Sequence, residues 1–445
     1  MPVGAFEPPK SEPPPHAVIE PSALRAANAP TGTGYTKIYS TLGAFAALKA
    51  DGSITAWGNI VYGGRNAPTG TGYTKIYSNG LAFAALKADG SITEWGDSYV
   101  GSSAPTGKGY TKIYSTYYAF ATLKADGSIT AWGDSDFGGS NAPTGTGYTK
   151  IYSTGAAFAA LKADGSIMAW GDVYNGYIPP GNGYTKIYST TNAFAALKAD
   201  GSIVAWGGPY NGGKGVPSGT GYTKIYSNAY AFAVIETDGS ITAWGSPDKG
   251  GTAPSGTGYT KIYSNTQAFA ALKTDGSITA WGNLGYGGTD APSDSGYTKI
   301  YSTDRAFAAL KTDGSITAWG ELYYGSTGAP SDSGYTKIYS AANAFAAIKA
   351  DGSIVAWGDT HAGGTAPSGS GYTKIYSTTH AFAAIKTDGS IVAWGDPYSG
   401  GTAPSGSGYT KIYSTDRAFA ALKTDGSITA WGDTHYGGTA PTASD

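Results

Sequence analysis

The chain has 445 residues, a formal net charge of −2, only 13% charged residues and no cysteine. The lack of cysteine excludes disulfide bonds and thiolate metal sites, and the balanced charge excludes a global basic field that would draw nucleic acid. No run approaches the roughly 18 apolar residues of a membrane-spanning helix. We therefore expect no nucleic-acid partner, no membrane insertion and no bound cofactor or metal.

The first segment, residues 1–26, is rich in proline and differs in composition from everything that follows. Its run Glu12-Pro13-Pro14-Pro15 favours polyproline II, an extended conformation that makes a stiff tether, although the same composition is typical of a disordered terminus. The segment lacks the basic-then-apolar pattern of a signal peptide. We predict a proline-rich tail or tether here, with both conformations open.

Residues 27–445 form one repetitive array. The stretch at residues 35–58, YTKIYSTLGAFAALKADGSITAWG, returns ten more times, and its tryptophan recurs every 36 to 38 residues with no larger gap. A fixed period in this range indicates one supersecondary unit repeated, so we predict a single repeat domain of eleven units. The repeated tryptophans are Trp57, Trp95, Trp132, Trp170, Trp206, Trp244, Trp281, Trp319, Trp357, Trp394 and Trp431.

Each unit consists of three strand-like segments and a variable segment. YTKIYS alternates and is rich in Tyr, Ile and Thr, AFAALK is apolar, and SITAWG is again strand-like. Asp-Gly separates the second and third segments in every unit and is the strongest short hairpin signal. The variable segment carries Gly-Gly or an equivalent and usually Ala-Pro, which favours a short outer edge strand or a shaped loop. We predict three to four strands per unit and an all-β fold.

The AFAAL run is apolar at nearly every position instead of alternating. Such a run predicts a strand that is buried on both faces. A sheet of three or four short strands is not stable alone, so the eleven sheets must pack against each other. The frequent alanine would let neighbouring sheets approach closely.

The unit resembles the regulator of chromosome condensation repeat, in which an apolar strand turns at Asp-Gly, runs through a strand into Trp-Gly and continues into a polar loop. The matching residues of one unit are Leu86, Asp89, Gly90, Trp95 and Gly96, and ten equivalent sets follow or precede them. The resemblance implies a β-propeller with radially arranged blades.

Two departures separate the chain from the general family pattern. The family's His before the second strand is absent, with Ala-Phe in its place, and the unit is short. In both respects the chain is more similar to the bacterial short-repeat branch, which includes a secreted β-lactamase inhibitor protein, and this implies an extracellular or cell-surface location. The eukaryotic member is a guanine-nucleotide exchange factor that docks on chromatin, and the chain has no basic tail to support that role.

Eleven blades exceed the four to eight of most propellers. Even tryptophan spacing disfavours a split into two propellers, so we predict one large closed ring, with an open spiralling array as the alternative. The Ala-Pro segment or a variant occurs at both ends of the array, at Pro30 and at Pro441. One end could therefore complete the blade at the other end, although the extra copy could equally be an unpaired cap.

The hairpin order assigns the connections to two faces. If YTKIYS runs up, the Asp-Gly turns lie on the lower face, and the connections after YTKIYS and after Trp-Gly lie on the upper face. Asp-Gly-Ser-Ile is identical in all units, whereas both upper connections vary and are rich in Tyr, with Asp, Arg and His. These residue types supply rigid contact area and hydrogen bonds in recognition surfaces. Drift of unrestrained solvent-facing positions is the alternative explanation.

We expect a partner-binding surface on the upper face, because drift alone would not retain aromatic residues there. Elsewhere the units keep two lysines, such as Lys75 and Lys87, with Glu236 replacing the second one in a single unit, and an aspartate such as Asp89 balances them, which indicates a solvated rim instead of a basic patch. The predicted partner-binding residues are Tyr62, Tyr99, Tyr117, Tyr118, Phe137, Tyr174, Tyr210, Tyr230, Tyr286, Asp304, Arg305, Tyr323, Tyr324, His361, His380, Tyr398, Asp416, Arg417, His435 and Tyr436.

Other chemistry has weaker support. The repeated Asp-Gly lacks the alternating oxygen ligands of a calcium loop, so we assign its Asp to the turn. GTGYTK lacks the Gly-Lys-Ser/Thr ending of a phosphate loop. His361 and His380, near Asp359 and Asp396, could form a metal site, but exposed loop histidines are the simpler explanation. No serine stands beside a His and an acid, so we predict a non-enzymatic protein, with carboxylate pairs across the propeller centre left open.

The pattern as a whole favours a propeller that binds a protein partner on its Tyr-rich upper face. A carbohydrate-binding or adhesive surface module is the alternative, because aromatic residues with Asp and Asn suit glycans, and eleven similar sites would give avidity. A further alternative is a structural component of a larger or phage-like assembly, anchored by residues 1–26.

Overall fold

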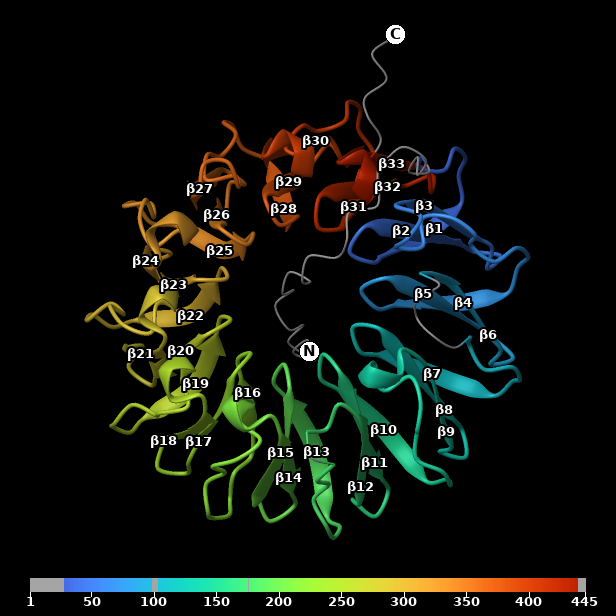
Figure 1. The fold of residues 1–445 in the computed structure, drawn as a ribbon. Coiled ribbons are helices and arrows are strands. Elements are labelled where there is room, and N and C mark those ends of the chain that lie inside the picture. Colours follow the sequence, from blue (N-terminus) through green and yellow to red (C-terminus); the bar gives the residue numbers. More distant parts are fainter. Residues whose placement is uncertain (1–27, 98–102, 175, 439–445) are drawn as a thin grey trace, which may run out of the picture.

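The computed structural model describes residues 28–97, 103–174 and 176–438, and these residues form eleven separate three-stranded sheets with no α-helix among them. We number the sheets as blades 1 to 11 in chain order, so that blade 1 is β1–β3 and blade 11 is β31–β33. Figure 1 shows the blades side by side around a central opening. The all-β prediction and the division into eleven repeats are confirmed.

Each blade contains the three predicted segments as antiparallel strands in the order first, second, third. The first strands are β1 (Tyr35–Ser40), β4 (Tyr73–Ser78), β7 (Tyr110–Ser115), β10 (Tyr148–Ser153), β13 (Tyr184–Ser189), β16 (Ile225–Ser227), β19 (Tyr259–Ser264), β22 (Tyr297–Ser302), β25 (Tyr335–Ser340), β28 (Tyr372–Ser377) and β31 (Tyr409–Ser414). The second strands are β2 (Ala44–Lys49), β5 (Ala82–Lys87), β8 (Ala119–Lys124), β11 (Ala157–Lys162), β14 (Ala193–Lys198), β17 (Ala231–Ile235), β20 (Ala268–Lys273), β23 (Ala306–Lys311), β26 (Ala344–Lys349), β29 (Ala381–Lys386) and β32 (Ala418–Lys423). The third strands are β3 (Ile54–Gly58), β6 (Ile92–Gly96), β9 (Ile129–Gly133), β12 (Ile167–Gly171), β15 (Ile203–Gly207), β18 (Ile241–Gly245), β21 (Ile278–Gly282), β24 (Ile316–Gly320), β27 (Ile354–Gly358), β30 (Ile391–Gly395) and β33 (Ile428–Gly432).

The variable segment forms a shaped loop, and no fourth strand forms in the described residues. In seven blades of the described part of the chain the segment contains one 3-10 turn that ends at a left-handed Gly, and in four of these an Asp or Asn side chain caps the start of the turn. In blade 3, for example, the Asp134 side chain accepts a hydrogen bond from the Asp136 backbone N–H, and Gly138 has φ of 88°. The turns are η1 (Ser135–Phe137), η2 (Pro209–Asn211), η3 (Pro247–Lys249), η4 (Leu284–Tyr286), η5 (Leu322–Tyr324), η6 (Pro397–Ser399) and η7 (Thr434–Tyr436).

The Asp-Gly hairpin is a three-residue loop, with a positive φ only at its Gly. In blade 1 the Gly52 N–H donates to the Lys49 carbonyl at 3.0 Å, and the Asp51 side chain accepts from both the N–H and the hydroxyl of Ser53. These two bonds hold the pKa of Asp51 below its ordinary value. The geometry is a type I turn followed by a left-handed residue, which is the usual form of a three-residue hairpin loop. The predicted turn role of the Asp is confirmed.

The core lies between blades, where one face of each blade packs on the opposite face of the next. Phe45 and Trp57 are paired across β2 and β3 with stacked rings 5.2 Å apart, and both are fully buried. They contact Ala418 and Leu422 of blade 11, while the other face of blade 1 receives the Phe–Trp pair of blade 2. Each pair buries roughly 400 Å², which corresponds to about 10 kcal/mol of gross hydrophobic free energy. The predicted burial of the second strand on both faces is confirmed.

The Gly-Gly pair after the third strand is required by the neighbouring blade and by its own backbone. A Cβ atom on Gly63 would lie 2.7 Å from the Phe83 ring, and a Cβ atom on Gly64 would lie 2.3 Å from the Gly58 carbonyl oxygen. The Gly63 carbonyl also accepts a hydrogen bond from the Trp95 indole at 3.0 Å. The repeated Trp-Gly and Gly-Gly are therefore two halves of one inter-blade contact.

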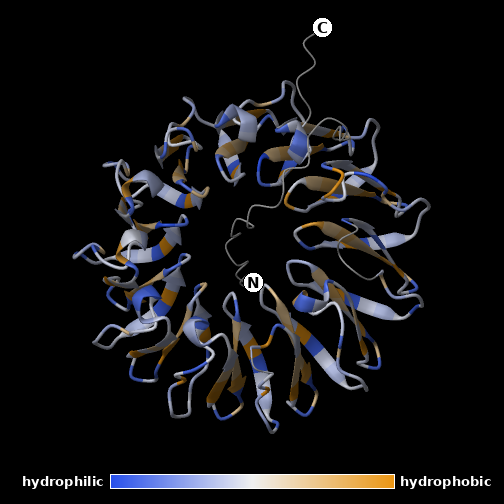
Figure 2. Ribbon diagram, viewed as in Figure 1, coloured by the Kyte–Doolittle hydropathy of each residue, from blue (hydrophilic) through white to orange (hydrophobic). Residues whose placement is uncertain are grey.

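The first strand of each blade lies nearest the central opening, and the third strand lies outermost, as β10 to β12 and β28 to β30 show in Figure 1. First strands of neighbouring blades lie close to each other. Figure 2 shows the hydrophobic residues gathered in the strands and the hydrophilic residues in the connections. The ends of the strands therefore form two polar faces, and the first strands form an inner edge.

Blades 11 and 1 are joined by the same contacts that join consecutive blades. The Tyr35 N–H donates to the Gly426 carbonyl, as the Tyr73 N–H does to Gly52 in blade 1. The Trp57 indole donates to the Gly437 carbonyl at 3.1 Å. The predicted tail at residues 1–26 and the copy of the Ala-Pro segment at Pro441 lie outside the described residues. Within the described residues no helix is both long and apolar enough to cross a membrane.

The contact between Gly63 and Phe83 leads to a prediction about stability. We expect Gly63→Ala to destabilise the protein by roughly 2–4 kcal/mol, because the new methyl group clashes with the ring and the residue keeps a positive φ. Gly70→Ala is the matched control, since Gly70 has φ of 96° and nothing within 4 Å of its Cβ position. It should cost only about 1 kcal/mol. Hydrogen exchange of the blade 2 amides measures both changes, and equal losses would contradict the proposed contact.

Candidate functional site

The two variable connections of each blade lie together at one end of the sheet, as predicted for the upper face. We call residues 41–43 and their equivalents the inner loops, and residues 59–64 and their equivalents the outer loops. In blade 1 the Asn59 N–H donates to the Gly43 carbonyl at 3.0 Å, and the Thr41 hydroxyl donates to the Tyr62 carbonyl at 2.9 Å. The inner and outer loops of a blade therefore form one surface.

The first position of the inner loop is structural, so the expectation that the whole loop varies freely was wrong. The Thr41 hydroxyl accepts a hydrogen bond from the Ala44 N–H while it donates to the outer loop. Asn228 does the same in blade 6, where its side-chain oxygen accepts from Ala231 and its amide donates to the Lys249 carbonyl. A short side chain with both a donor and an acceptor meets this need, so the position is Thr or Asn in ten blades, and blade 9 has Ala341 instead.

The second position of the inner loop links neighbouring blades through its backbone. The Leu42 N–H donates to the Gly80 carbonyl at 3.2 Å, and the same bond joins Asp416 of blade 11 to Leu42 of blade 1. The link uses no side-chain atoms, so the side chain at this position is free to change. The upper face thus has a fixed backbone with variable side chains.

The third position of the inner loop packs against the last residue of the outer turn. Arg305 lies over the rings of Tyr286 and Tyr324, at 4.9 Å from each. Lys249 lies 3.6 Å from the Tyr230 ring centroid. Arginine and lysine over aromatic rings contribute about 0.5–2 kcal/mol each. These contacts restrict the conformations of the side chains on the upper face.

A second group of aromatic residues forms around blades 1, 3 and 11. The rings of Tyr118 and Phe137 meet edge to face at 4.5 Å. Burial raises the pKa of Tyr62, and the nearby Tyr436, Asp416 and Tyr118 raise it further, which places these groups close to one another. The inward-facing tyrosines thus stay neutral and act as packing and hydrogen-bonding groups.

The predicted residues divide into two classes by exposure, and Tyr99 lies outside the described residues. The half-buried class consists of Tyr62, Tyr117, Tyr118, Phe137, Tyr230, Tyr286, Arg305, Tyr324, His380, Asp416 and Tyr436. The exposed class consists of Tyr174, Tyr210, Asp304, Tyr323, His361, Tyr398, Arg417 and His435. The first class shapes the upper face, and the second projects from it.

The most exposed large side chains stand on the 3-10 turns of the outer loops. Tyr210, Tyr323 and Tyr398 are 75 to 80% exposed, and Leu284 and Leu322 are 70 and 61% exposed. All five occupy the first or second position of a turn, whereas the third position folds inward. The two leucines were missed by the sequence analysis, although they hold the same place in the repeat as residues it selected.

His361 and His435 are exposed loop residues, and His380 is half-buried. The Nδ1 atoms of His361 and His435 lie 3.4 and 3.3 Å from Asp359 and Asp433, whose carboxylates also accept the histidine backbone N–H groups. The described residues contain no group of three His, Cys, Asp or Glu side chains that could hold a metal ion. The acids are thus engaged in the turns.

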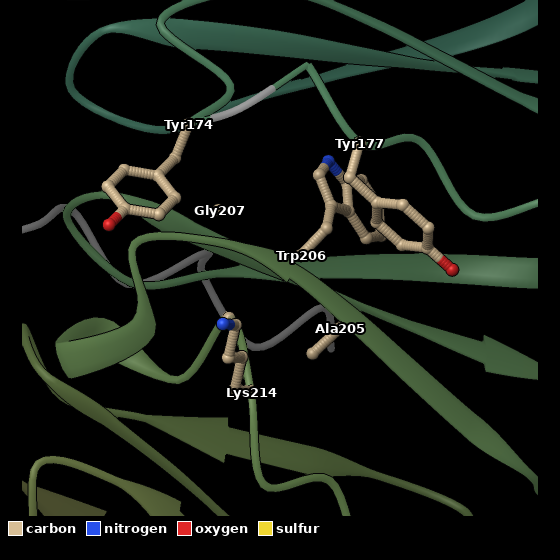
Figure 3. A pocket seen from close by; sticks show the side chains of 7 residues that line it. Tyr174, Tyr177, Ala205, Trp206, Gly207 and Lys214 are labelled. Carbon is tan, nitrogen blue, oxygen red and sulfur yellow. The ribbon is translucent and has the colours of Figure 1, made fainter.

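One pocket on this side of the molecule was not predicted. It has a volume of about 320 Å³ between blades 4 and 5 and is lined by Tyr174, Tyr177, Trp206 and Lys214 (Figure 3). Both tyrosines are about half exposed, and Tyr174 has an unusual positive φ of 42°. The sequence signal was the blade 4 connection, NGYIPPGNG, which departs from the Gly-Gly and Ala-Pro pattern of other blades.

The radial sheets, the inter-blade core and the two faces define a repeat protein of the β-propeller type. No family model and no curated protein matches the chain. Among solved structures, the CRINKLY WD40 ectodomain of the Arabidopsis thaliana receptor kinase ACR4 is 20% identical with a TM-score of 0.33, and the match covers 61% of this chain and 100% of that chain. Prp20p from Saccharomyces cerevisiae is 14% identical with a TM-score of 0.32, over 59% of this chain and 86% of that chain. Each of these matches covers less than two thirds of this chain.

A buried acid between blades 2 and 3 leads to a pH-dependent prediction. Glu94 stands where the other ten blades have Ala, and burial raises its pKa from an ordinary 4.5 to about 7, which nearby donors of Trp132 and Ala104 offset only in part. Because the folded state binds this proton more tightly than the unfolded state, stability falls as the pH rises from about 4.5 to 7. We expect Glu94→Gln to raise the free energy of unfolding by about 1–2 kcal/mol at pH 8, since the group is partly exposed.

The gain from Glu94→Gln should become small near pH 4.5, where the carboxyl is protonated in the folded state and half protonated in the unfolded state. Glu94→Ala, the residue of the other blades, should lose the same pH dependence. Denaturant unfolding of the three proteins between pH 4.5 and 8 measures the differences. A difference that does not change with pH would show that the Glu94 carboxyl is not the titrating group.

Proposed function

We propose that this chain is a non-enzymatic propeller that binds a protein partner on its upper face. The observation that carries the proposal is the set of exposed Tyr and Leu side chains on the 3-10 turns of the outer loops, led by Tyr210, Tyr323 and Tyr398. Exposed large apolar groups cost solubility and mark interaction sites when they recur on one face. Tyrosine on a rigid support gives contact area at a low entropy cost.

The upper face also has the order that recognition requires. Backbone bonds between inner loops and the Thr or Asn hydrogen bonds fix each loop, while Arg305 and Lys249 hold the inward tyrosines. Binding to an ordered surface loses less conformational entropy than binding to mobile loops. The Asp-Gly face offers no comparable feature, because it repeats one turn eleven times.

The proposal also covers how the blades are arranged and to which repeat family the chain is assigned. We propose that the blades close into a single ring, which the bonds from Tyr35 to Gly426 and from Trp57 to Gly437 support. The Asp-Gly and Trp-Gly pattern supports assignment to the short-repeat branch of the regulator of chromosome condensation repeats. An extracellular or cell-surface role in a bacterium follows from that assignment and is part of the proposal.

Carbohydrate binding is the second candidate function, favoured by the pocket between blades 4 and 5. Its exposed rings of Tyr174 and Tyr177 could stack on a sugar, and Lys214 could donate to a hydroxyl or an acidic group. Trp206 supplies only the floor, because it is 1% exposed. The pocket occurs at a connection that departs from the repeat, so this candidate predicts one site instead of many.

The upper-face proposal is tested by replacing three exposed tyrosines together, as Tyr210→Ser, Tyr323→Ser and Tyr398→Ser. We expect capture of the partner to fall at least tenfold, because exposed aromatic anchors carry about 1–2 kcal/mol or more each. The matched control is Ala50→Thr, Ala88→Thr and Ala125→Thr on the lower face, where other blades already carry Thr. Capture is measured by quantitative mass spectrometry on immobilised wild type and variants, and hydrogen exchange maps the bound protein.

Protection of the upper face by a captured protein, lost in the tyrosine variant and kept in the control, is the expected result. A partner that binds both variants equally would contradict the proposal. Binding on a glycan array that Tyr177→Ala abolishes, without any protein captured, would replace it with the carbohydrate candidate.

A further inference from the structure

The first strand of every blade places a lysine on the inner edge of the molecule. It is the third residue of YTKIYS, from Lys37 in blade 1 to Lys411 in blade 11, and we call these eleven residues the lysine belt. All of them are exposed, so solvent reaches the inner edge. The expectation that both lysines of a repeat lie on a balanced rim is therefore wrong for the first lysine, because its strand is the innermost one.

The second lysine of each repeat behaves differently. Lys49 lies over the Tyr35 ring at 4.9 Å beside the Asp-Gly turn and lowers the pKa of Asp51. Within the described residues, no ion pair joins a carboxylate to any lysine of the belt. The belt is thus a local excess of positive charge in a chain whose net charge is −2.

In eight of the eleven blades the belt lysine lies over the ring of the tyrosine two residues later. The Lys75 Nζ lies 4.6 Å from the Tyr77 ring centroid, and seven further blades have the same contact at 4.4 to 4.8 Å. The tyrosine is itself fixed, because its hydroxyl meets the backbone of the next blade, as Tyr39 meets Ile76. The ammonium groups are therefore held on a rigid wall.

Neighbouring members of the belt lie close enough to repel one another. Burial lowers the pKa of Lys224, and Lys261 and Lys186 of the adjacent blades lower it further. Repulsion of this kind destabilises the array and increases at low salt. Neither packing nor charge balance accounts for a lysine at this position.

Comparison of the repeats indicates that the positive charge of the belt lysines is retained for its own sake. A lysine over a tyrosine at an exposed site contributes only about 0.5–1 kcal/mol, yet the belt position is Lys in all eleven blades. Exposed positions of the upper face have diverged over the same repeats, and the second lysine has become Glu236 in blade 6. The Asp of the Asp-Gly turn is also an exposed charge in every copy, but its bonds to Ser53 and its equivalents explain it, whereas no such bond explains the belt lysines.

We propose that the lysine belt binds a polyanion whose charge is carried by closely spaced phosphate groups, of the inorganic polyphosphate type. The inference goes beyond partner binding on the upper face and rests only on the proposed ring. Sheets packed face to face lie about 10 Å apart, and this spacing sets the circle on which the second strands of eleven blades lie. Neighbouring strands lie about 4.8 Å apart, so the first strands lie on a smaller inner circle, roughly 25 Å across. A phosphate polymer inside that circle meets lysines from every side and releases its counterions.

The tyrosines favour a polyphosphate over a single-stranded nucleic acid. Proteins that bind single strands offer free aromatic faces on which the bases stack. Here the belt lysine covers the ring of Tyr77, and the next blade holds the hydroxyl of its equivalent Tyr39. The inner edge therefore offers charge without a stacking platform.

The test is titration calorimetry of the full chain with inorganic polyphosphate at low and high salt. The belt variant combines Lys75→Gln, Lys112→Gln, Lys150→Gln and Lys186→Gln, and we expect it to lose about tenfold or more in affinity, with a weaker salt dependence. The control combines Lys87→Gln, Lys124→Gln, Lys162→Gln and Lys198→Gln, which changes the net charge equally in the same blades. It should bind within about twofold of wild type, and circular dichroism confirms that both variants fold.

Equal losses in the two lysine variants, or no binding by wild type, would overturn the proposal. Tighter binding of a thymidine oligonucleotide than of polyphosphate with the same number of phosphates would overturn it in favour of a nucleic acid. The Tyr210, Tyr323 and Tyr398 variant should bind polyphosphate as wild type does. Failure of the lysine belt is thereby distinguished from failure of the upper-face proposal.

Discussion

The whole structure depends on one contact, the packing of a stacked Phe–Trp pair on the alanine-rich face of the preceding blade. No blade buries its own pair completely, because the cluster around Phe45 and Trp57 is closed by residues of blade 11, such as Ala418 and Leu422. The indole N–H reaches a Gly carbonyl of the preceding blade in the same step. A blade is therefore stable only between two neighbours, as in other repeat proteins, and the two terminal blades gain most from meeting each other.

The same constraint separates the residues that can change from those that cannot. Residues that build the inter-blade contact, including the Gly-Gly pair and the alanines of the second strand, are nearly invariant between repeats. The inner and outer loops hold their shape through backbone atoms and one Thr or Asn, so their remaining side chains are open to selection for binding. The belt lysines fit neither class, since they are exposed and unchanged, and this is why we assign them a separate role.

Much of the fold could be predicted because the signals are local and repeated eleven times. The hairpin follows from the Asp-Gly pair, the doubly buried strand from the continuous apolar run AFAAL, and the two-face assignment from chain direction. The structural role of Thr41 could not be predicted, because it depends on a carbonyl 21 residues away in the outer loop. The 3-10 turns could not be predicted, because the Pro and Gly residues of the variable segment are compatible with an edge strand as well as with a turn.

The candidate sites were harder to predict from the sequence, because they too depend on contacts between distant parts of the chain. Tyr323 and Tyr324 occupy adjacent positions of one turn, and the first is exposed whereas the second packs inward. No periodicity in the sequence predicts which of the two is exposed. The position of the belt lysines depends on which strand is innermost, which requires the radial order of the sheet. The pocket between blades 4 and 5 comes from a connection of different sequence, and only the three-dimensional structure places Tyr177 beside Trp206 and Lys214.

The central claim is that the same type of Phe–Trp packing contact joins all eleven blades into one ring. Negative-stain or cryo-electron microscopy of the purified chain, with class averages viewed along the axis, tests it most directly. The account predicts closed discs with eleven spokes and a central opening, in which the contact between blades 11 and 1 cannot be told from the others. Open arcs, spirals or end-to-end chains would contradict it and would remove both the continuous upper face and the lysine belt.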